Sequence, residues 1–370
     1  MHFLSVFLVD LLSFLILLST IVMVHEFGHY FFAVANGVKV DEFALGFGRE
    51  IVGWNSKNGT RWKICILPFG GFCRFFGDED ASSAVVKRDK IEKLSEQSKS
   101  MCLHCKTPWQ RMQILVAGPL FNYLLAIVFF TLFYYHIGIV TFSNGIDGVV
   151  SGGAAEKAGI MVGDIVDRVD GGKIRDFSDL QQRVLASLGR PMLVEVIRDG
   201  KTVAMRVVPD MKATIDIFGK TIETPVIGVE SRKSSEPKRS SVLEAFFESL
   251  RHVYKISVTS MVAIYRMIFG RRDVGEIMGP IKIAKYSGTI IRKGIWGFIH
   301  FMAMTSAGLG FMNLLPIPML DGGQLVLCLV EIVRRKPLSE KFENILARFG
   351  FFLLIFLTIF TLIKDIIGIF

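Results

Sequence analysis

Three long apolar runs constrain the fold of this chain more than any other feature. They span residues 3–24, 114–135 and 349–370, and charges interrupt them only at Asp10 and near the end of the last run. About 20 consecutive apolar residues cross the hydrocarbon core of a bilayer as a helix. Each run is therefore predicted to form a transmembrane helix.

A fourth apolar region, residues 295–333, is broken by glycines and prolines and contains Asp321. We interpret it as a further membrane segment, which makes the chain a multi-pass α-helical membrane protein with four transmembrane segments. The hydrophobic share of 51% agrees with this class, because it is high for a soluble chain. With their flanks, the predicted segments are residues 1–35, 110–136, 293–333 and 345–370.

The distribution of positive charge predicts the orientation. Residues 1–35 contain no Lys or Arg, whereas residues 36–111 and the short 334–348 loop are rich in both. Basic loops face the cytoplasm, so these two loops are predicted to be cytoplasmic and the long 137–290 stretch to lie outside, with both termini. The first run has no preceding basic residue and no small-residue cleavage site, so we expect it to remain attached. The net charge of +9 is then a topology signal and requires no nucleic-acid partner.

The cysteines argue against a disulfide framework. None lies in the predicted external stretch; the five are Cys65, Cys73, Cys102, Cys105 and Cys328. Cys102 and Cys105 form a C-x-x-C pair around His104, which is either an ordinary loop or a second metal or redox pair.

The stretch VHEFGHYF places His25, Glu26 and His29 at the end of the first apolar run. Helical residues at i and i+4 share a face, so the two imidazoles converge, and that spacing suits Zn²⁺. Zinc polarises a scissile carbonyl and acidifies water, while a carboxylate at the position of Glu26 takes the proton. Packed core histidines or an interfacial loop are the alternatives. Ionisable groups in a membrane segment are costly, which favours function.

A catalytic zinc site needs a third protein ligand. The stretch FMNLLPIPMLDGGQL, residues 311–325, supplies Asp321, the only charge between Lys293 and Glu331. Pro316 and Pro318 are expected to break the helix before it, and irregular backbone at membrane depth is tolerated where it lines a cavity or packs against protein. Asp321 is therefore the predicted third ligand.

H-E-F-G-H in the first segment, together with N-L-L-P-x-P-x-L-D-G-G in a late one, resembles the site-2 protease family of intramembrane zinc metalloproteases, peptidase family M50. The nearest resemblance is to bacterial regulators of envelope stress signalling. The resemblance implies Zn²⁺ as cofactor, with metal ligands His25, His29 and Asp321 and catalytic base Glu26.

The same resemblance implies that Asn313 and Pro316 contact the substrate, with Asn313 donating to the substrate or to the developing oxyanion. Gln324 departs from the family, in which many members carry His after D-G-G, at a position that is not a ligand. A segment at 117–127, with Gly118 and Asn122, resembles the family's second helix; we interpret it as helix packing through glycine.

The resemblance also implies partners. The expected substrates are transmembrane helices of single-pass proteins, such as an anti-sigma factor already trimmed by another protease or a remnant signal peptide. The expected location is the bacterial inner membrane, with the active site near the cytoplasmic side. A PDZ adaptor whose metal site is silent is the alternative, and a soluble-type peptidase tethered to the membrane is a weaker one.

Residues 36–109 contain two glycine-punctuated stretches around Asn58-Gly59, a turn dipeptide, and are predicted to form a β-hairpin. It is either an ordinary cytoplasmic hairpin or, as the resemblance implies, a membrane-re-entrant hairpin beside the active site. An exposed strand edge there could pair with an unwound substrate.

Residues 144–210 change character: a small-residue turn, a short helix, a hairpin, a capped helix and a second hairpin around Asp199-Gly200. The stretch AGIMVGDIV resembles a bacterial PDZ domain, so an extracytoplasmic α+β PDZ domain is expected, one that either binds a peptide end or excludes bulky substrates. Residues 211–292 are predicted to contain a linker at 231–241 and an amphipathic helix at 242–269 on the membrane surface.

Overall fold

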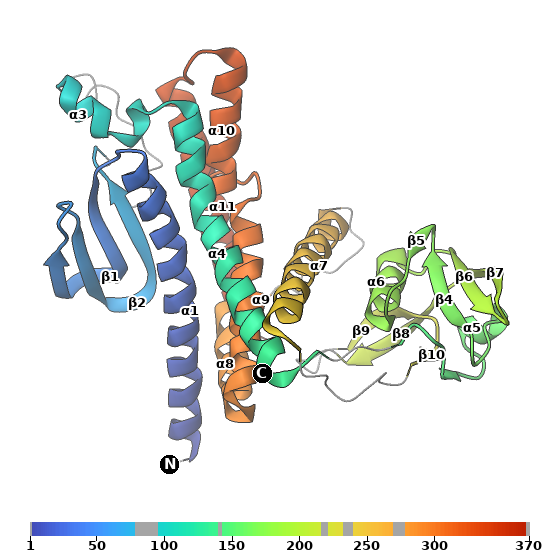
Figure 1. Cartoon of the computed structure of the whole chain (residues 1–370). Coiled ribbons are helices and arrows are strands. Elements are labelled where there is room, and N and C mark those ends of the chain that lie inside the picture. The colour runs from blue at the N-terminus through green and yellow to red at the C-terminus, as the bar shows by residue number, and fades with distance from the viewer. Residues whose placement is uncertain are drawn as a thin grey trace. The chain divides into compact units, whose positions relative to one another are not determined.

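The computed structural model describes residues 2–77, 95–139, 143–215, 221–231, 240–268 and 278–367. They form two compact units (Figure 1): Met1–Tyr134 together with Val242–Phe370, and Tyr135–Ser241. We call these the helical unit and the β-rich unit. Most of the predicted linker at 231–241 and part of the basic 36–111 loop lie outside the described residues.

Four described helices of the helical unit are long and apolar enough to cross a membrane. They are α1 (His2–Ala35), α4 (Pro108–Ile137), α9 (Ile295–Asn313) and α11 (Glu340–Ile367). In α1, α4 and α9 the apolar residues are distributed around the whole circumference, as expected for helices in contact with lipid. The predicted multi-pass helical membrane fold is therefore confirmed.

The region predicted as one membrane segment, 293–333, consists of two helices. Helix α9 ends at Asn313, and α10 (Asp321–Arg334) begins at the predicted metal ligand. The intervening loop contains both prolines, which lack a backbone N–H and disfavour helix at the preceding residue. Gly322 lets α10 start directly against this loop, because a Cβ there would collide with the carbonyl of Leu314.

Two charges inside the apolar runs hold helix α8 (Pro280–Lys293). Asp365 of α11 is fully buried and accepts hydrogen bonds from the backbone N–H of Gly279 at 3.2 Å and of Lys282 at 3.1 Å, at the first turn of α8. Asp10 of α1 accepts a hydrogen bond from Arg292 near the end of α8, at 2.6 Å. These two carboxylates therefore tether an amphipathic helix to the transmembrane helices.

Helix α7 (Val242–Ile268) occupies the range of the predicted amphipathic helix and packs on α4 and α9. Its contacts with α4 include two hydroxyl pairs, Thr131 with Ser249 at 3.0 Å and Tyr123 with Ser257 at 3.1 Å. Several large apolar residues remain exposed along its length: Leu243, Phe247, Tyr254, Met261 and Tyr265. An apolar exposed face is consistent with the predicted membrane-surface position.

Strands β1 (Val40–Asn55) and β2 (Arg61–Phe75) form the hairpin, which lies beside α1 in Figure 1. Both strands bend, β1 at Gly46 and Gly48 and β2 at Gly70, all of which have positive φ. The hairpin consequently folds over on itself, and its register is folded over in the same way: Glu42 of β1 lies opposite Arg74, at one end of β2, and also opposite Arg61, at the other end.

Short helices α3 (Glu96–Met101) and η1 (Leu103–Cys105) lead from this region into α4. None of the five cysteines, all of which lie in the described part of the chain, forms a disulfide, and this includes Cys102 and Cys105.

The β-rich unit contains its own hydrophobic core, built around Val166, Val194 and Val196. Its four-stranded sheet has the order β5-β4-β6-β7, and β8–β9 and β3–β10 form two further pairs. The elements are β3 (Gly148–Val149), α5 (Ala154–Lys157), β4 (Ile165–Val169), β5 (Gly172–Lys173), α6 (Phe177–Ser187), β6 (Met192–Arg198), β7 (Lys201–Val207), β8 (Asp210–Ile215), β9 (Thr221–Val226) and β10 (Val229–Glu230). Because β10 pairs with β3, the unit extends past the 144–210 range.

Candidate metal centre and active site

Helix α1 and the start of α10 bring three metal-ligating side chains together. His25 and His29, each 8% exposed, lie one helical turn apart on α1, and their Nε2 atoms are 3.2 Å apart. Asp321 completes the group, with Oδ2 at 3.3 Å from Nε2 of His25 and Oδ1 at 3.5 Å from Nε2 of His29. Residues almost 300 positions apart in the sequence thus form one candidate metal site.

The spacing of these three side chains fits zinc. With bonds of about 2.0–2.1 Å in tetrahedral geometry, neighbouring ligand atoms are roughly 3.3–3.4 Å apart. The separations of 3.2, 3.3 and 3.5 Å match this value. Asp321 Oδ2 is buried and accepts no hydrogen bond from the described residues, so one ligand oxygen is available for a cation. Two imidazoles and a carboxylate are also the donor types of catalytic zinc sites.

Helix α4 supports the two histidines from behind. Nδ1 of His29 lies 2.8 Å from the backbone carbonyl of Ile114, and Nδ1 of His25 lies 3.2 Å from the side-chain Nδ2 of Asn122. Gly118 permits this approach, because a Cβ there would lie 2.6 Å from Cε1 of His29. The sequence interpretation gave this segment to helix packing and missed the contact of Asn122. An amide inside an uninterrupted apolar run was the available signal.

Glu26 faces the hairpin. Its carboxylate accepts a hydrogen bond from the backbone N–H of Cys73 in β2 and interacts electrostatically with His25, His29 and Asp321. Gly71 of β2 lies beside it: a Cβ there would make only ordinary contact with Cγ of Glu26, at 3.6 Å, but would collide with the carbonyl of Ala44 in β1. The carboxylate is therefore fixed beside the metal ligands without being one of them.

Asn313, the last residue of α9, also reaches the cluster. Its Nδ2 lies 3.5 Å from Nε2 of His25, so an amide donor lies beside the candidate metal position. Pro316 is exposed in the loop that leads from Asn313 to Asp321. The structure thus brings five of the six predicted site residues together, and it places Pro316 in their connecting loop.

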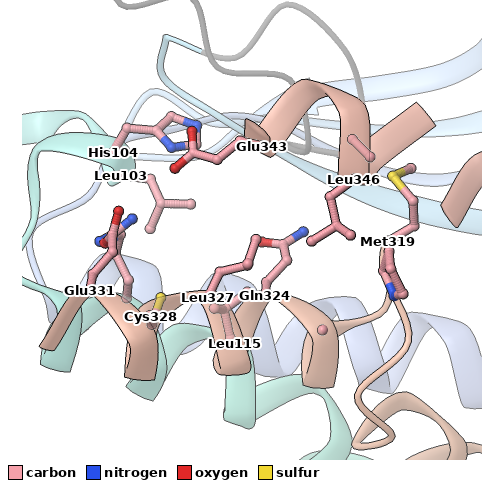
Figure 2. Close-up of a pocket in the computed structure, with 14 residues that line it drawn as sticks. Leu103, His104, Leu115, Met319, Gln324, Leu327, Cys328, Glu331, Glu343 and Leu346 are labelled. Atoms are coloured by element: carbon pink, nitrogen blue, oxygen red, sulfur yellow. The ribbon is translucent and has the colours of Figure 1, made fainter. Parts of the chain in front are cut away.

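A cavity of about 80 Å³ lies between α4, α10, α11 and η1. Gln324, three residues after Asp321, points into it from α10, and Leu346 faces it from α11 (Figure 2). The ion pair between Arg111 and Glu331 forms part of its wall. A cavity of this size has room for a few water molecules, and its walls are mostly apolar with a few polar groups. Gln324, where many family members have His, therefore borders this cavity instead of the metal cluster.

The sequence profile of peptidase family M50 matches residues 13–357. The chain belongs to peptidase family M50. A candidate zinc metalloprotease of Mesorhizobium japonicum is 36% identical, over 98% of this chain and 100% of that protein. The metalloprotease MmpA of Caulobacter vibrioides is 32% identical, over 97% of this chain and 96% of its own. With the His-His-Asp site and the membrane helices, these matches define a multi-pass zinc metalloprotease.

Among solved structures, the crystal structure of the PDZ domain of the SdrC-like protein from Listeria innocua aligns with 25% of this chain and 98% of its own. The identity is 19% and the TM-score 0.20. These values assign no function to the β-rich unit.

Proposed function

We propose that this M50 metalloprotease is an intramembrane endopeptidase that cleaves the transmembrane segments of single-pass membrane proteins. The observation that carries the proposal is the location of the site. His25 and His29 lie inside a helix that is long enough to span a membrane, and the third ligand begins a helix that follows another such span after a short loop. A site in that position acts on peptide bonds at membrane depth.

Each site residue has a proposed role. His25, His29 and Asp321 hold the zinc ion, which when bound polarises the scissile carbonyl and lowers the pKa of water. Glu26 takes the proton of the attacking water and returns it to the leaving amine. Asn313 donates its amide N–H to the substrate oxygen as negative charge develops there.

A substrate helix must unwind before it can be cut, because its peptide groups are hydrogen-bonded to one another in lipid. We propose that the β1–β2 hairpin binds the unwound segment by strand pairing. Two features support this: β2 donates the hydrogen bond that fixes Glu26, and large apolar side chains of β1, such as Ile51 and Trp54, are exposed.

The expected substrates are anti-sigma factor-like proteins trimmed by an earlier protease, or remnant signal peptides. The charge distribution supports an inner-membrane orientation with the hairpin cytoplasmic and the β-rich unit outside. We propose that the β-rich unit is a PDZ-like size filter that excludes bulky substrates, and a receptor for peptide ends is its alternative role.

The test is Glu26→Gln, compared with Glu244→Gln, an exposed glutamate of α7. With a tagged single-pass substrate, Glu26→Gln is expected to abolish cleavage while the purified chain retains about one zinc, and Glu244→Gln is expected to cleave normally. Retained cleavage in Glu26→Gln would refute the mechanism. An intact chain without bound zinc would favour the silent PDZ adaptor.

A further inference from the structure

Each of the two metal-ligating histidines has one ring nitrogen, Nδ1, that faces away from Asp321. Both of these nitrogens contact α4. An imidazole that binds a metal through Nε2 carries its proton on Nδ1 and must donate that proton to an acceptor. For His29 the acceptor is the carbonyl of Ile114, at 2.8 Å. For His25 the neighbour is the amide of Asn122, at 3.2 Å.

The orientation of the Asn122 amide follows from this requirement. If Nδ2 of Asn122 faces His25, its N–H points at the Nδ1–H of the imidazole once Nε2 of His25 binds a metal. Two donors then face each other and neither can accept. Oδ1 of Asn122 meanwhile accepts no hydrogen bond from the described residues. Rotating the amide by 180° exchanges its two atoms within the same shape and turns Oδ1 to the Nδ1–H of His25. In the orientation with Nδ2 towards His25 the oxygen end of the amide has no partner among the described residues, so no other hydrogen bond holds the amide in that orientation.

The surroundings of Asn122 hold it firmly. Its side chain is fully buried, and the hydroxyl of Ser306 in α9 donates to its backbone carbonyl at 2.8 Å. Gly310 of α9 packs against it so closely that a Cβ there would lie 3.3 Å from Cβ of Asn122. The amide is therefore presented to His25 by two packed helices.

We propose that Asn122 is a positioning residue for the zinc site: its amide oxygen accepts the Nδ1–H of His25, which fixes the tautomer and the ring orientation with Nε2 free for zinc. The inference rests on the proposed zinc ligands His25, His29 and Asp321. Such outer partners of metal-ligating histidines typically contribute 10–100-fold to metal affinity. A residue that merely fills space between α4 and α9 would contribute nothing to it.

The experiment compares Asn122→Leu with Asn122→Asp in the purified full-length chain. Leucine keeps the size and removes the acceptor, whereas a carboxylate keeps the shape and only accepts. Zinc affinity, measured by competition with a chelator, is expected to fall 10–100-fold in Asn122→Leu and to stay within a few-fold of the parent in Asn122→Asp. The melting temperature of the metal-free chain reports folding independently. If Asn122→Leu does not fold, Asn122→Ala is measured instead, with a loss of at least several-fold expected.

Two results would overturn the proposal. Unchanged zinc affinity in the variant without an acceptor would show that Asn122 only packs. A loss in Asn122→Asp as large as in Asn122→Leu would show that the amide does not act as acceptor. His25→Ala is measured in parallel: if it keeps zinc at the parent affinity, then the zinc site itself is wrong, and the failure is not that of Asn122.

Discussion

The substitution Gly118→Ala adds one methyl group beside the two metal-ligating histidines and so tests the geometry of the metal site. A Cβ at residue 118 would lie 2.6 Å from Cε1 of His29 and 2.7 Å from Cε1 of His25. Ordinary carbon–carbon contacts are about 3.5–4.0 Å, so the rings would have to retreat by roughly 0.8–1 Å. Ligand distances in metal sites hold to about 0.2 Å, and the displacement is several times larger.

Helix α4 cannot relieve this contact without loss. Moving it outward would lengthen the 2.8 Å hydrogen bond from His29 Nδ1 to the carbonyl of Ile114 and open the close contact of Gly28 with Ala117. We therefore expect Gly118→Ala to weaken zinc binding at least 10-fold and to reduce cleavage by about 100-fold or more. Helix propensity acts in the opposite direction, because Ala stabilises a helix by about 0.5–1 kcal/mol relative to Gly.

The assays are zinc affinity by chelator competition and cleavage of a single-pass substrate. Gly308→Ala is the matched control, because a Cβ at that position of α9 meets open space among the described residues. It should bind zinc and cleave like the parent. If Gly118→Ala also behaves like the parent in both assays, the proposed placement of α4 against the two histidines is refuted.

Three further predictions concern other parts of the chain. Asp365→Ala removes the buried carboxylate at the first turn of α8 and should destabilise the chain by about 1–2 kcal/mol in thermal unfolding, with a smaller loss for Asp365→Asn; equal stability would contradict the capping role. In the β-rich unit, hydrogen bonds from Arg198 hold the pKa of Asp164 below its usual range, so this pair stabilises the fold above about pH 4 and loses its effect as the pH falls through the lowered pKa. The difference in hydrogen-exchange protection of β4 and β6 between the parent and Asp164→Asn should therefore shrink below about pH 4, and a constant difference would exclude the pair as its source. Deleting 143–231 should allow cleavage of substrates with an intact outer domain if the β-rich unit is a filter, whereas slower cleavage of trimmed substrates alone would identify it as a receptor.

The local part of the site could be predicted from the sequence because helix periodicity determines it. His25 and His29 share a face at i and i+4 in any helix, and Asp321 was identifiable as the only charge between Lys293 and Glu331. The break between α9 and α10 followed from two prolines. These inferences need only the chain's own local geometry.

The rest depends on contacts between distant segments, which one sequence does not encode in a readable pattern. Asp10 and Asp365 counted only as interruptions of apolar runs, although they hold α8. Asn122 was assigned to packing because its partner is 97 positions away. The folded-over register of β1 and β2 depends on bends at glycines, and residue alternation alone predicts a simple hairpin.

Mapping the scissile bond tests the central proposal most directly. A tagged single-pass substrate, reconstituted with the purified enzyme in lipid vesicles, is analysed by mass spectrometry of its products. The predicted cut lies inside the apolar segment of the substrate, is lost after zinc chelation and is absent with Glu26→Gln. A cut confined to the soluble flanks, or one that persists with Glu26→Gln, would contradict intramembrane zinc proteolysis by this site.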